Sequence, residues 1–475
     1  MRTKHQIIVA CFFFLVCSAL IAEQPDRGQW GEWHTRNMVS DVTGLPDSFD
    51  PETGENIKWS VPLGTHTHSS PVVTGGRVLI GTNNGQPRDA KQQGDRGVLM
   101  CLDEKDGRLH WQLVVPKLDG LRLSDWPKTG ITSSATVDDD RVYIVTNRGE
   151  VMCLDLKPPA NSPVIIWRFD IRKQLGVHQH DAAHCSVLVD ESFVYACTSN
   201  GVSDSHRELV APDAPSLIAL DKKTGRLVAR DGEHMGQNTI HCTWSSPAMG
   251  RVGDRRLLFF GGGDGVCYAF EALQPAASKG AVQTLKRVWR FDCDPDAPKE
   301  NIIRYQDNRR VGPSNITGMP VFYKDRVYVT AGGDLWHGKP KCWLKCIDAT
   351  GTGDITRKGE RWTYPLVRHC MSTPSIANGL VFITDCGRMV HCVDAETGKP
   401  YWTHKTVGEI WASTLVADGK VFVASRRGDF WVFAASREKK LLSRIELGPI
   451  SSTPTTANGV LYVATMDRLY AIARK

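Results

Sequence analysis

The sequence predicts an all-β protein: an eight-bladed β-propeller of four-stranded antiparallel blades, whose ring is closed by a strand from the amino-terminal end. Three observations predict this fold. A strand-and-turn unit of about forty residues recurs along the chain. Tryptophan, with 14 copies among 475 residues, recurs at one place in that unit, and the last unit lacks a strand that an early segment matches. Radial closure hides the strand edges that one open sheet of this size would expose.

The repeat is clearest near the carboxyl end of the chain. The segment 372–374 (Ser-Thr-Pro) leads to the apolar run 379–383, then to the turn 394–398, and then to Trp402. The same order returns twice before the chain ends. Short β-branched and aromatic runs between Gly and Asp turns are strand and hairpin signals, so we expect four strands in each unit.

Five earlier copies bring the number of units to eight. The Ser-Ser-Pro element that begins a unit recurs, in full or weakened form, at residues 69–71, 133–135, 185–186, 245–247 and 318–320. The last unit ends at residues 469–472 without a fourth strand, and residues 55–60 match the missing one. Pairing these two segments would close the ring. The expected propeller therefore covers residues 55–475, after a lead-in over residues 23–54.

The amino-terminal end has the pattern of a secretory signal peptide over residues 1–22. Arg2 and Lys4 precede a short apolar run that ends near Ala22, where Glu23 follows. This run is too short for a comfortable membrane span, although an uncleaved anchor helix is the alternative. We expect cleavage near Ala22 and a periplasmic or secreted mature chain that is monomeric and has no transmembrane span.

The composition argues against two classes of protein, intrinsically disordered chains and nucleic-acid-binding proteins. The chain is 41% hydrophobic, which excludes intrinsic disorder. Its 58 Lys and Arg residues are scattered and form no basic stripe with interleaved aromatics, so no nucleic-acid partner is expected.

Four of the cysteines share one position in the repeat. Cys101, Cys153, Cys346 and Cys392 each stand two residues before an Asp, where another unit has Ala219. A buried free cysteine behaves as a small apolar residue. The pattern therefore predicts small core residues and does not favour a disulfide scaffold.

The second half of the unit carries a recognisable motif. It has the form apolar-x-Ala-Leu-Asp-x-x-Thr-Gly-x-x-x-Trp and appears at residues 101–111, 219–229 and 392–402. In this motif the chain resembles the pyrroloquinoline-quinone-type β-propeller repeat family over residues 55–475. The resemblance implies that Asp and Thr-Gly shape a hairpin and that Trp packs between blades. The family includes quinoprotein alcohol dehydrogenases and a non-catalytic outer-membrane-protein assembly lipoprotein, and secreted bacterial propellers have a similar lead-in.

Long insertions are expected to gather on one face of the ring. Successive strands alternate direction, so loops from second to third strand share a face with loops from a fourth strand to the next unit. Nearly all extra chain falls in these loops, at residues 82–96, 115–130, 171–183, 199–215, 231–243, 293–317 and 331–341. The exception is the segment 271–285, between a third and a fourth strand. Long loops on a rigid scaffold usually carry function.

Histidine and cysteine residues gather just before the first strands, which line the axis of a propeller. The candidate ligands of a transition metal at the mouth of the channel are His66, His68, His178, His180, His184, His241, Cys242, His369, Cys370 and Met371. Histidine and cysteine are transition-metal ligands. No compact metal motif is present, and the alternative is that these histidines form hydrogen bonds around a water-filled channel.

Three functions remain open. The preferred one is a binding or scaffold module of the cell envelope, whose loops and strand edges receive an unidentified protein or peptide. The second, which the resemblance implies, is a quinoprotein dehydrogenase that uses pyrroloquinoline quinone with calcium, with Trp244 and Trp411 as stacking residues. The adjacent Cys-Cys pair common in such enzymes is missing, so an enzyme is less favoured. The third is saccharide binding by Trp126, Trp336 or Trp343.

Overall fold

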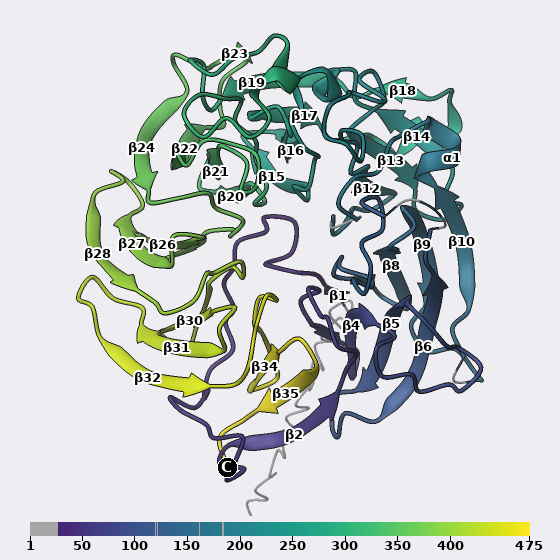
Figure 1. Ribbon diagram of the computed structural model, residues 1–475, viewed down its shortest axis with the longest axis vertical. Helices are drawn as coiled ribbons and strands as arrows, with labels where there is room; N and C mark the ends of the chain where they lie inside the picture. Colours follow the sequence, from purple (N-terminus) through teal and green to yellow (C-terminus); the bar gives the residue numbers. More distant parts are fainter. Residues whose placement is uncertain (1–26, 119, 121, 161, 183–184) are drawn as a thin grey trace, which may run out of the picture.

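The structure is a computed structural model that describes residues 27–118, 120, 122–160, 162–182 and 185–475. The predicted signal peptide and His184 lie outside the described residues. Eight sheets surround a common axis (Figure 1), which confirms the predicted all-β propeller. The helices of the described part are short: α1 (Ile171–Leu175) and three 3-10 turns, η1 (Met235–Asn238), η2 (Pro275–Lys279) and η3 (Ile302–Tyr305).

The sheets are numbered here as blades I to VIII. Blade I consists of β3 (Val72–Thr74), β4 (Arg77–Asn83), β5 (Arg96–Asp103) and β6 (Leu109–Pro116), and blade II of β7 (Thr136–Asp138), β8 (Arg141–Val145), β9 (Glu150–Asp155) and β10 (Ile165–Asp170). Blade III consists of β11 (Leu188–Val189), β12 (Phe193–Cys197), β13 (Leu217–Asp221) and β14 (Leu227–Arg230). Blade IV consists of β15 (Ala248–Val252), β16 (Arg255–Gly261), β17 (Val266–Glu271) and β19 (Arg287–Asp292).

Blade V consists of β20 (Val321–Tyr323), β21 (Arg326–Gly332), β22 (Cys342–Asp348) and β24 (Glu360–Leu366), and blade VI of β25 (Ser375–Ala377), β26 (Leu380–Asp385), β27 (Met389–Asp394) and β28 (Pro400–Lys405). Blade VII consists of β29 (Leu415–Ala417), β30 (Lys420–Ala424), β31 (Asp429–Ala434) and β32 (Leu441–Glu446). Blade VIII consists of β33 (Thr455–Ala457), β34 (Val460–Ala464), β35 (Arg468–Ile472) and β2 (Ile57–Pro62). Three two-residue strands, β1 (Arg27–Gly28), β18 (Gln283–Thr284) and β23 (Gly353–Asp354), extend blades II, III and IV at their edges.

The ring closes as predicted, through the amino-terminal strand β2. It pairs antiparallel with β35, placing Trp59 opposite Ala471 and Val61 opposite Leu469. The first and last strands of the propeller thus share one sheet. Without β2, the strand β35 would have an unpaired edge.

The Ser-Ser-Pro elements form a belt of hydrogen bonds around the axis. At seven of the eight blade junctions, a backbone N–H just before a first strand donates to the hydroxyl at the equivalent position of the next blade. The donor and acceptor pairs are 70 and 134, 134 and 186, 186 and 246, 319 and 373, 373 and 413, 413 and 453, and 453 and 70. The eighth junction has Met319 where a hydroxyl would stand. The belt explains why Ser or Thr recurs at this buried position.

Removing one hydroxyl from this belt should lower stability by a measurable amount. Ser413→Ala would leave the buried N–H of Thr373 without its 2.9 Å acceptor, at an expected cost of about 1–2 kcal/mol. Ser413→Thr should cost far less, because threonine already occupies the equivalent positions 373 and 453. Urea unfolding of the two variants would measure this difference, and equal stability would contradict the role assigned to the belt.

The repeated tryptophans join neighbouring blades, as the motif implies. The indole N–H of each donates to a backbone carbonyl in the next blade at 3.0–3.1 Å, for Trp59, Trp111, Trp167, Trp289, Trp362 and Trp402. Gly225 and Gly398 have positive φ and lie directly under the indoles of Trp167 and Trp362, where a Cβ would come within 2.5–2.6 Å of a ring atom. The Thr-Gly of the motif therefore serves both the turn and the packing of the tryptophan.

The cysteines of the repeat are core residues. Cys101, Cys153, Cys346 and Cys392 are buried and free, as predicted. They lie among the apolar side chains between adjacent sheets, which form the core.

A segment before β2, residues 29–50, crosses the inner strands of several blades; we name it the crossing segment. It passes through the centre of the ring in Figure 1. The buried guanidinium of Arg36 donates to the carbonyls of Ser186, Val187 and Pro247, which precede the inner strands of blades III and IV. On either side of Arg36, backbone or side-chain hydrogen bonds join residues 35, 37 and 38 to Phe322, Ile376 and Val416 in blades V, VI and VII.

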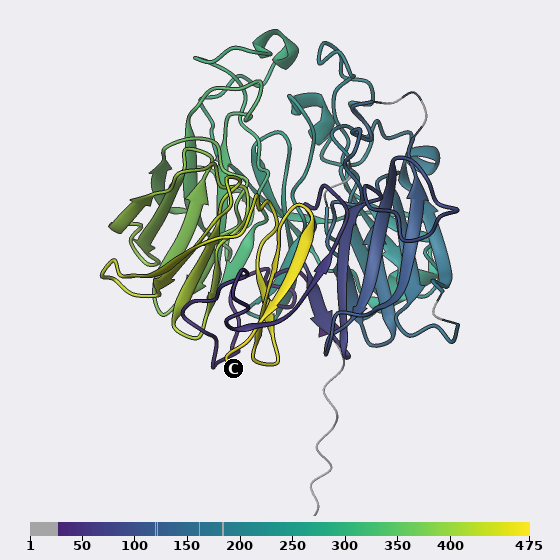
Figure 2. The ribbon, with the colours of Figure 1, turned by 60° about the horizontal axis from the view of Figure 1, so that its bottom comes forward.

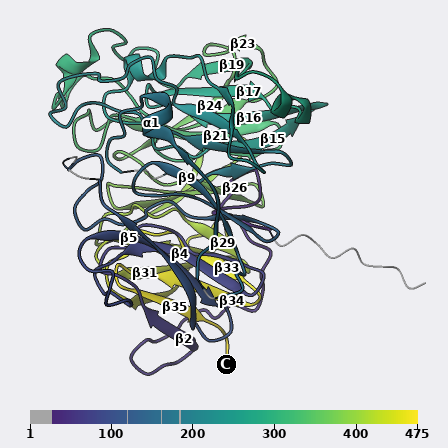
Figure 3. The ribbon, with the colours of Figure 1, turned by 90° about the vertical axis from the view of Figure 1, so that its right-hand side faces the viewer.

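The long insertions lie where the strand directions predict. All seven fall between second and third strands or between blades, and Figures 2 and 3 show the long teal and green loops gathered at one end of the axis. The segment 272–286, between β17 and β19, instead carries β18, which pairs with the outer strand of blade III. One end of the propeller is therefore rich in loops.

Candidate functional site

A pocket of about 800 Å³ opens at the loop-rich end of the axis. Its walls come from the residues that precede the inner strands and from the long insertions. Five tryptophans line it: Trp30, Trp126, Trp244, Trp336 and Trp411. Because Trp30 belongs to the crossing segment, that segment contributes to the wall of the pocket. We name this space the axial pocket.

The two tryptophans predicted as stacking residues, Trp244 and Trp411, both line the axial pocket. Trp336 lies between them, with its ring centroid 5.3 Å from Trp244 and 6.1 Å from Trp411. The planes meet at 84° and 89°, so each contact is edge to face. The guanidinium of Arg426 lies 3.7 Å from the centre of the Trp411 ring, a cation–π contact that covers one face of that ring.

A second depression, of about 860 Å³, adjoins the axial pocket and is rich in arginine. The two spaces share His66, Arg368, Glu409 and Arg426 in their walls. Arg388 and Arg427 complete the set of four arginines. Glu409 lies 3.7 Å from Arg426 and is the one carboxylate in the described part of the chain that pairs with any of the four. We name this region the arginine depression. Its positive charge exceeds its negative charge, which favours anionic ligands.

Three of the predicted metal ligands lie on the wall of the axial pocket beside these arginines. His66, His68 and Met371 line it, and the ring of His68 lies 6.3 Å from that of Trp411. They are separate from the main histidine cluster described next.

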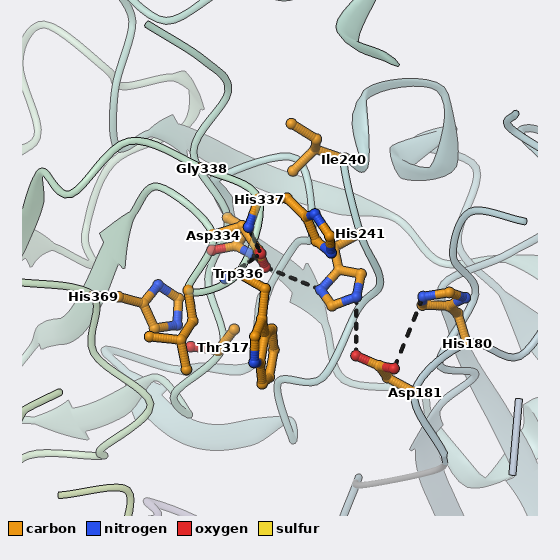
Figure 4. A network of polar contacts seen from close by, with 12 residues as sticks. His180, Asp181, Ile240, His241, Thr317, Asp334, Trp336, His337, Gly338 and His369 are labelled. Atoms are coloured by element: carbon orange, nitrogen blue, oxygen red, sulfur yellow. Dashed lines mark hydrogen bonds and ion pairs between the residues drawn. The ribbon is translucent and has the colours of Figure 1, made fainter. Parts of the chain in front are cut away.

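The main cluster is built around His241, which is held between two buried carboxylates (Figure 4). Its Nδ1 lies 3.0 Å from Asp334 and its Nε2 lies 2.9 Å from Asp181. Asp334 also accepts hydrogen bonds from the backbone N–H groups of Trp336 and His337, which fix its position. His180 lies on the other side of Asp181, 3.9 Å from it.

The charges within this cluster follow from burial and from the carboxylates. Burial opposes protonation of His241, but Asp334 and Asp181 outweigh it and raise the pKa of His241 to about 10. Burial, with the neighbouring His241, lowers the pKa of His180 to about 3. Despite its own burial, Asp334 has a pKa well below the ordinary value, because it faces His241. The cluster thus holds a cationic ring and a neutral ring side by side.

Two histidines of this cluster were not predicted from the sequence. The ring of His206 lies 4.7 Å from that of His180 and 5.3 Å from that of His241, and the ring of His337 lies 4.3 Å from His206. Both come from long insertions, within residues 198–216 and 333–341. His180 and His241 were predicted because they stand just before inner strands. His206 and His337 do not stand before an inner strand, so the same criterion did not select them.

The remaining predicted ligands have other surroundings. His369 is buried, and its Nδ1 lies 2.5 Å from the carbonyl of Gly333. The thiol of Cys370 donates to the carbonyl of Thr384. Cys242 is buried and forms an isolated antiparallel β-bridge with Gly201. Neighbouring residues of an extended chain point to opposite sides, so each cysteine faces away from the histidine before it. His178 is half-buried and approaches His180 and Asp204.

Comparison with known proteins identifies the family. The family model described as outer membrane protein assembly factor BamB matches residues 95–273, 281–443 and 390–475. A comparison with curated proteins finds no match. None of the helices in the described part of the chain has the length and apolar character needed to cross a bilayer.

Solved structures share the fold at low sequence identity. BamB from Moraxella catarrhalis is 14% identical, with a TM-score of 0.56, over 88% of this chain and 96% of that chain. The quinohemoprotein alcohol dehydrogenase ADHIIG from Pseudomonas putida HK5 is 14% identical, with a TM-score of 0.60, over 93% and 79%. A europium-containing methanol dehydrogenase is 13% identical, with a TM-score of 0.64, over 94% and 98%. These likenesses concern the fold, whereas the family model spans most of the sequence, and on that evidence the chain belongs to the outer membrane protein assembly factor BamB family.

Proposed function

We propose that this chain is an exported binding and scaffold module of the cell envelope, which receives an acidic peptide segment of a partner protein at its loop-rich end. The observation that supports this proposal is the continuity of the axial pocket with the arginine depression. Together they offer an aromatic cavity beside a cationic surface on a rigid ring. The assembly role named in the family's description is consistent with a protein partner.

The chemistry of the two spaces defines the segment that would fit. Arg368, Arg388 and Arg427 are exposed, so their guanidinium groups are accessible to carboxylates, which they can bind through paired hydrogen bonds. The edge-to-face tryptophans next to them would accept an apolar or aromatic side chain. A peptide with several Asp or Glu residues around one aromatic residue satisfies both.

A quinone cofactor fits the axial pocket less well. A flat ring needs two parallel walls, whereas Trp244, Trp336 and Trp411 meet edge to face and Arg426 already covers one face of Trp411. The carboxylates that line the pocket are Asp181, which is bound to His241 and to the indole of Trp126, and Glu409, which is paired with Arg426. These contacts favour the binding module over the dehydrogenase.

Binding of labelled peptides would test the proposal. We expect fluorescence anisotropy to show binding of octapeptides with six Glu or Asp residues and one Phe, and no binding of matched peptides in which Lys replaces the acids. Binding should weaken as salt is added. The double variant Arg368→Glu and Arg427→Glu should weaken binding at least tenfold, which corresponds to about 1.4 kcal/mol.

The matched control reverses two charges at the opposite end of the ring. Lys105 and Lys223 are exposed in turns between third and fourth strands, so Lys105→Glu with Lys223→Glu should leave binding unchanged. Equal binding of acidic and basic peptides, or equal loss in both double variants, would contradict the proposal. Reduction of a dye acceptor after reconstitution with pyrroloquinoline quinone and calcium would support the enzyme instead.

A further inference from the structure

Four imidazole rings converge at one side of the axial pocket from four separate loops. His180 and His241 precede the inner strands of blades III and IV, while His206 and His337 come from the insertions of blades III and V. The ring centroids of His180, His206 and His241 lie 4.7–5.3 Å apart. Such convergence of one side-chain type from distant parts of the sequence is typical of a ligand site.

The nitrogen atoms of three of these rings face a common point. The Nε2 atoms of His180 and His206 lie 3.0 Å apart. His180, His206 and His241 each offer a ring nitrogen, and the three nitrogens lie within 4.8 Å of one another. Ligand nitrogens around a tetrahedral zinc ion are about 3.3 Å apart, because each lies about 2.0–2.1 Å from the metal. Small side-chain movements would therefore bring all three into a coordination shell.

The surroundings of His241 have the arrangement of an outer coordination shell. A histidine that binds a metal through one nitrogen usually donates its other N–H to a carboxylate. The Nδ1 of His241 lies 3.0 Å from Asp334, which is itself fixed by backbone N–H groups and by the side-chain amide of Asn315 at 3.1 Å. This contact leaves Nε2 as the nitrogen that faces Asp181 and His180.

Asp181 supplies the charge and the fourth position that a divalent cation needs. One of its oxygens lies 2.9 Å from His241 and the other lies 3.9 Å from His180. Asp181 and Asp334 are both buried, at 5% and 2% exposed, so two negative charges stand beside the three rings in a region that water barely reaches. On binding through Nε2, His241 would release the proton that it shares with Asp181 to solvent, and the divalent ion would then balance the two carboxylates.

We propose that His180, His206 and His241 bind a divalent transition-metal ion of the zinc type, with the carboxylate of Asp181 as the fourth ligand. Three imidazoles and one carboxylate suit Zn²⁺ and its neighbours better than Ca²⁺ or Mg²⁺, which take oxygen ligands. Asp181 also lines the axial pocket, so the ion would lie in its wall. This inference does not depend on the identity of the partner proposed above.

Metal analysis of the tag-free full chain tests the proposal. After chelator treatment and dialysis against Zn²⁺, we expect one bound zinc ion per chain by mass spectrometry, and a higher melting temperature with zinc than without it. Co²⁺ should give the visible bands of a low-coordinate nitrogen and oxygen site without a thiolate-to-cobalt band. A thiolate band would place Cys242 or Cys370 at the ion and overturn the assignment.

The decisive variant is His206→Ala, because His206 is half-exposed on a loop and its loss leaves the core intact. It should weaken zinc binding at least tenfold, as should Asp181→Asn. His234→Ala removes a histidine that is exposed and paired with Asp213, and should bind zinc as the unaltered chain does. Wild-type affinity in His206→Ala, or loss of binding in His178→Ala alone, would overturn the proposal and move the ion to the group formed by His178, His180 and Asp204.

Discussion

A chain that begins at Leu63 should unfold at a much lower urea concentration than the chain that begins at Arg27, and without a single cooperative transition. Removing β2 leaves β35 with an unpaired edge along its whole length. The truncation also removes the crossing segment with Arg36, and it removes Trp59, whose indole packs on Gly107 and Tyr462 and donates to the carbonyl of Glu104. Loss of a buried tryptophan alone costs about 3–5 kcal/mol, a large part of the stability of a typical domain.

The control for this truncation is a substitution in an exposed loop. Residues 89–91 are exposed at the tip of the β4–β5 loop, and replacing them with glycine and serine should change the free energy of unfolding by less than about 0.5 kcal/mol. Denaturant unfolding followed by tryptophan fluorescence would measure both. If both variants unfolded at one midpoint, neither the pairing of β2 with β35 nor the crossing segment would contribute measurably to the free energy of unfolding.

Arg36→Ala is expected to destabilise the protein by about 3–5 kcal/mol. The side chain is fully buried and donates to the carbonyls of Trp30, Ser186, Val187 and Pro247. Burial lowers the pKa of Arg36 to about 10, so the group is still a cation at neutral pH. Its removal would leave several buried acceptors without a donor.

Two further variants separate the charge of Arg36 from its geometry. Arg36→Lys keeps the charge but cannot reach carbonyls on several sides, so it should recover only part of the loss. Arg251→Ala, at an exposed position of blade IV, should cost less than about 0.5 kcal/mol. The urea midpoint should fall for Arg36→Ala with an unchanged slope. A loss no greater than that of Arg251→Ala would contradict the anchoring role.

The propeller ring could be predicted because the interactions that form it are local and recur in each unit. The Asp, Thr-Gly and Trp of each unit act within one hairpin or on the adjacent blade, so their spacing appears in the sequence unchanged. The crossing segment could not be predicted in this way. Arg36 and Asn37 belong to no repeat, and their partners in the blades lie between 150 and 339 residues away. An arginine in such a segment looks like any surface arginine.

The candidate site could be predicted only in part, for a similar reason. His180 and His241 stand beside the Ser-Ser-Pro elements, whose place on the axis follows from the repeat. His206 and His337 lie in insertions, and the path of a long loop depends on contacts that sequence spacing does not report. Cys242 and Cys370 share the right position along the chain, but the alternation of side chains in extended backbone turns their thiols into the core.

The crossing segment also has a consequence for biosynthesis. Trp30 and Arg36 are made before any blade, yet the groups that hold them come from sheets made much later. The contacts that hold the crossing segment are therefore incomplete in a nascent or truncated chain, even when most of its sheets are folded. The peptide binding that we propose would therefore be a property of the completed chain only.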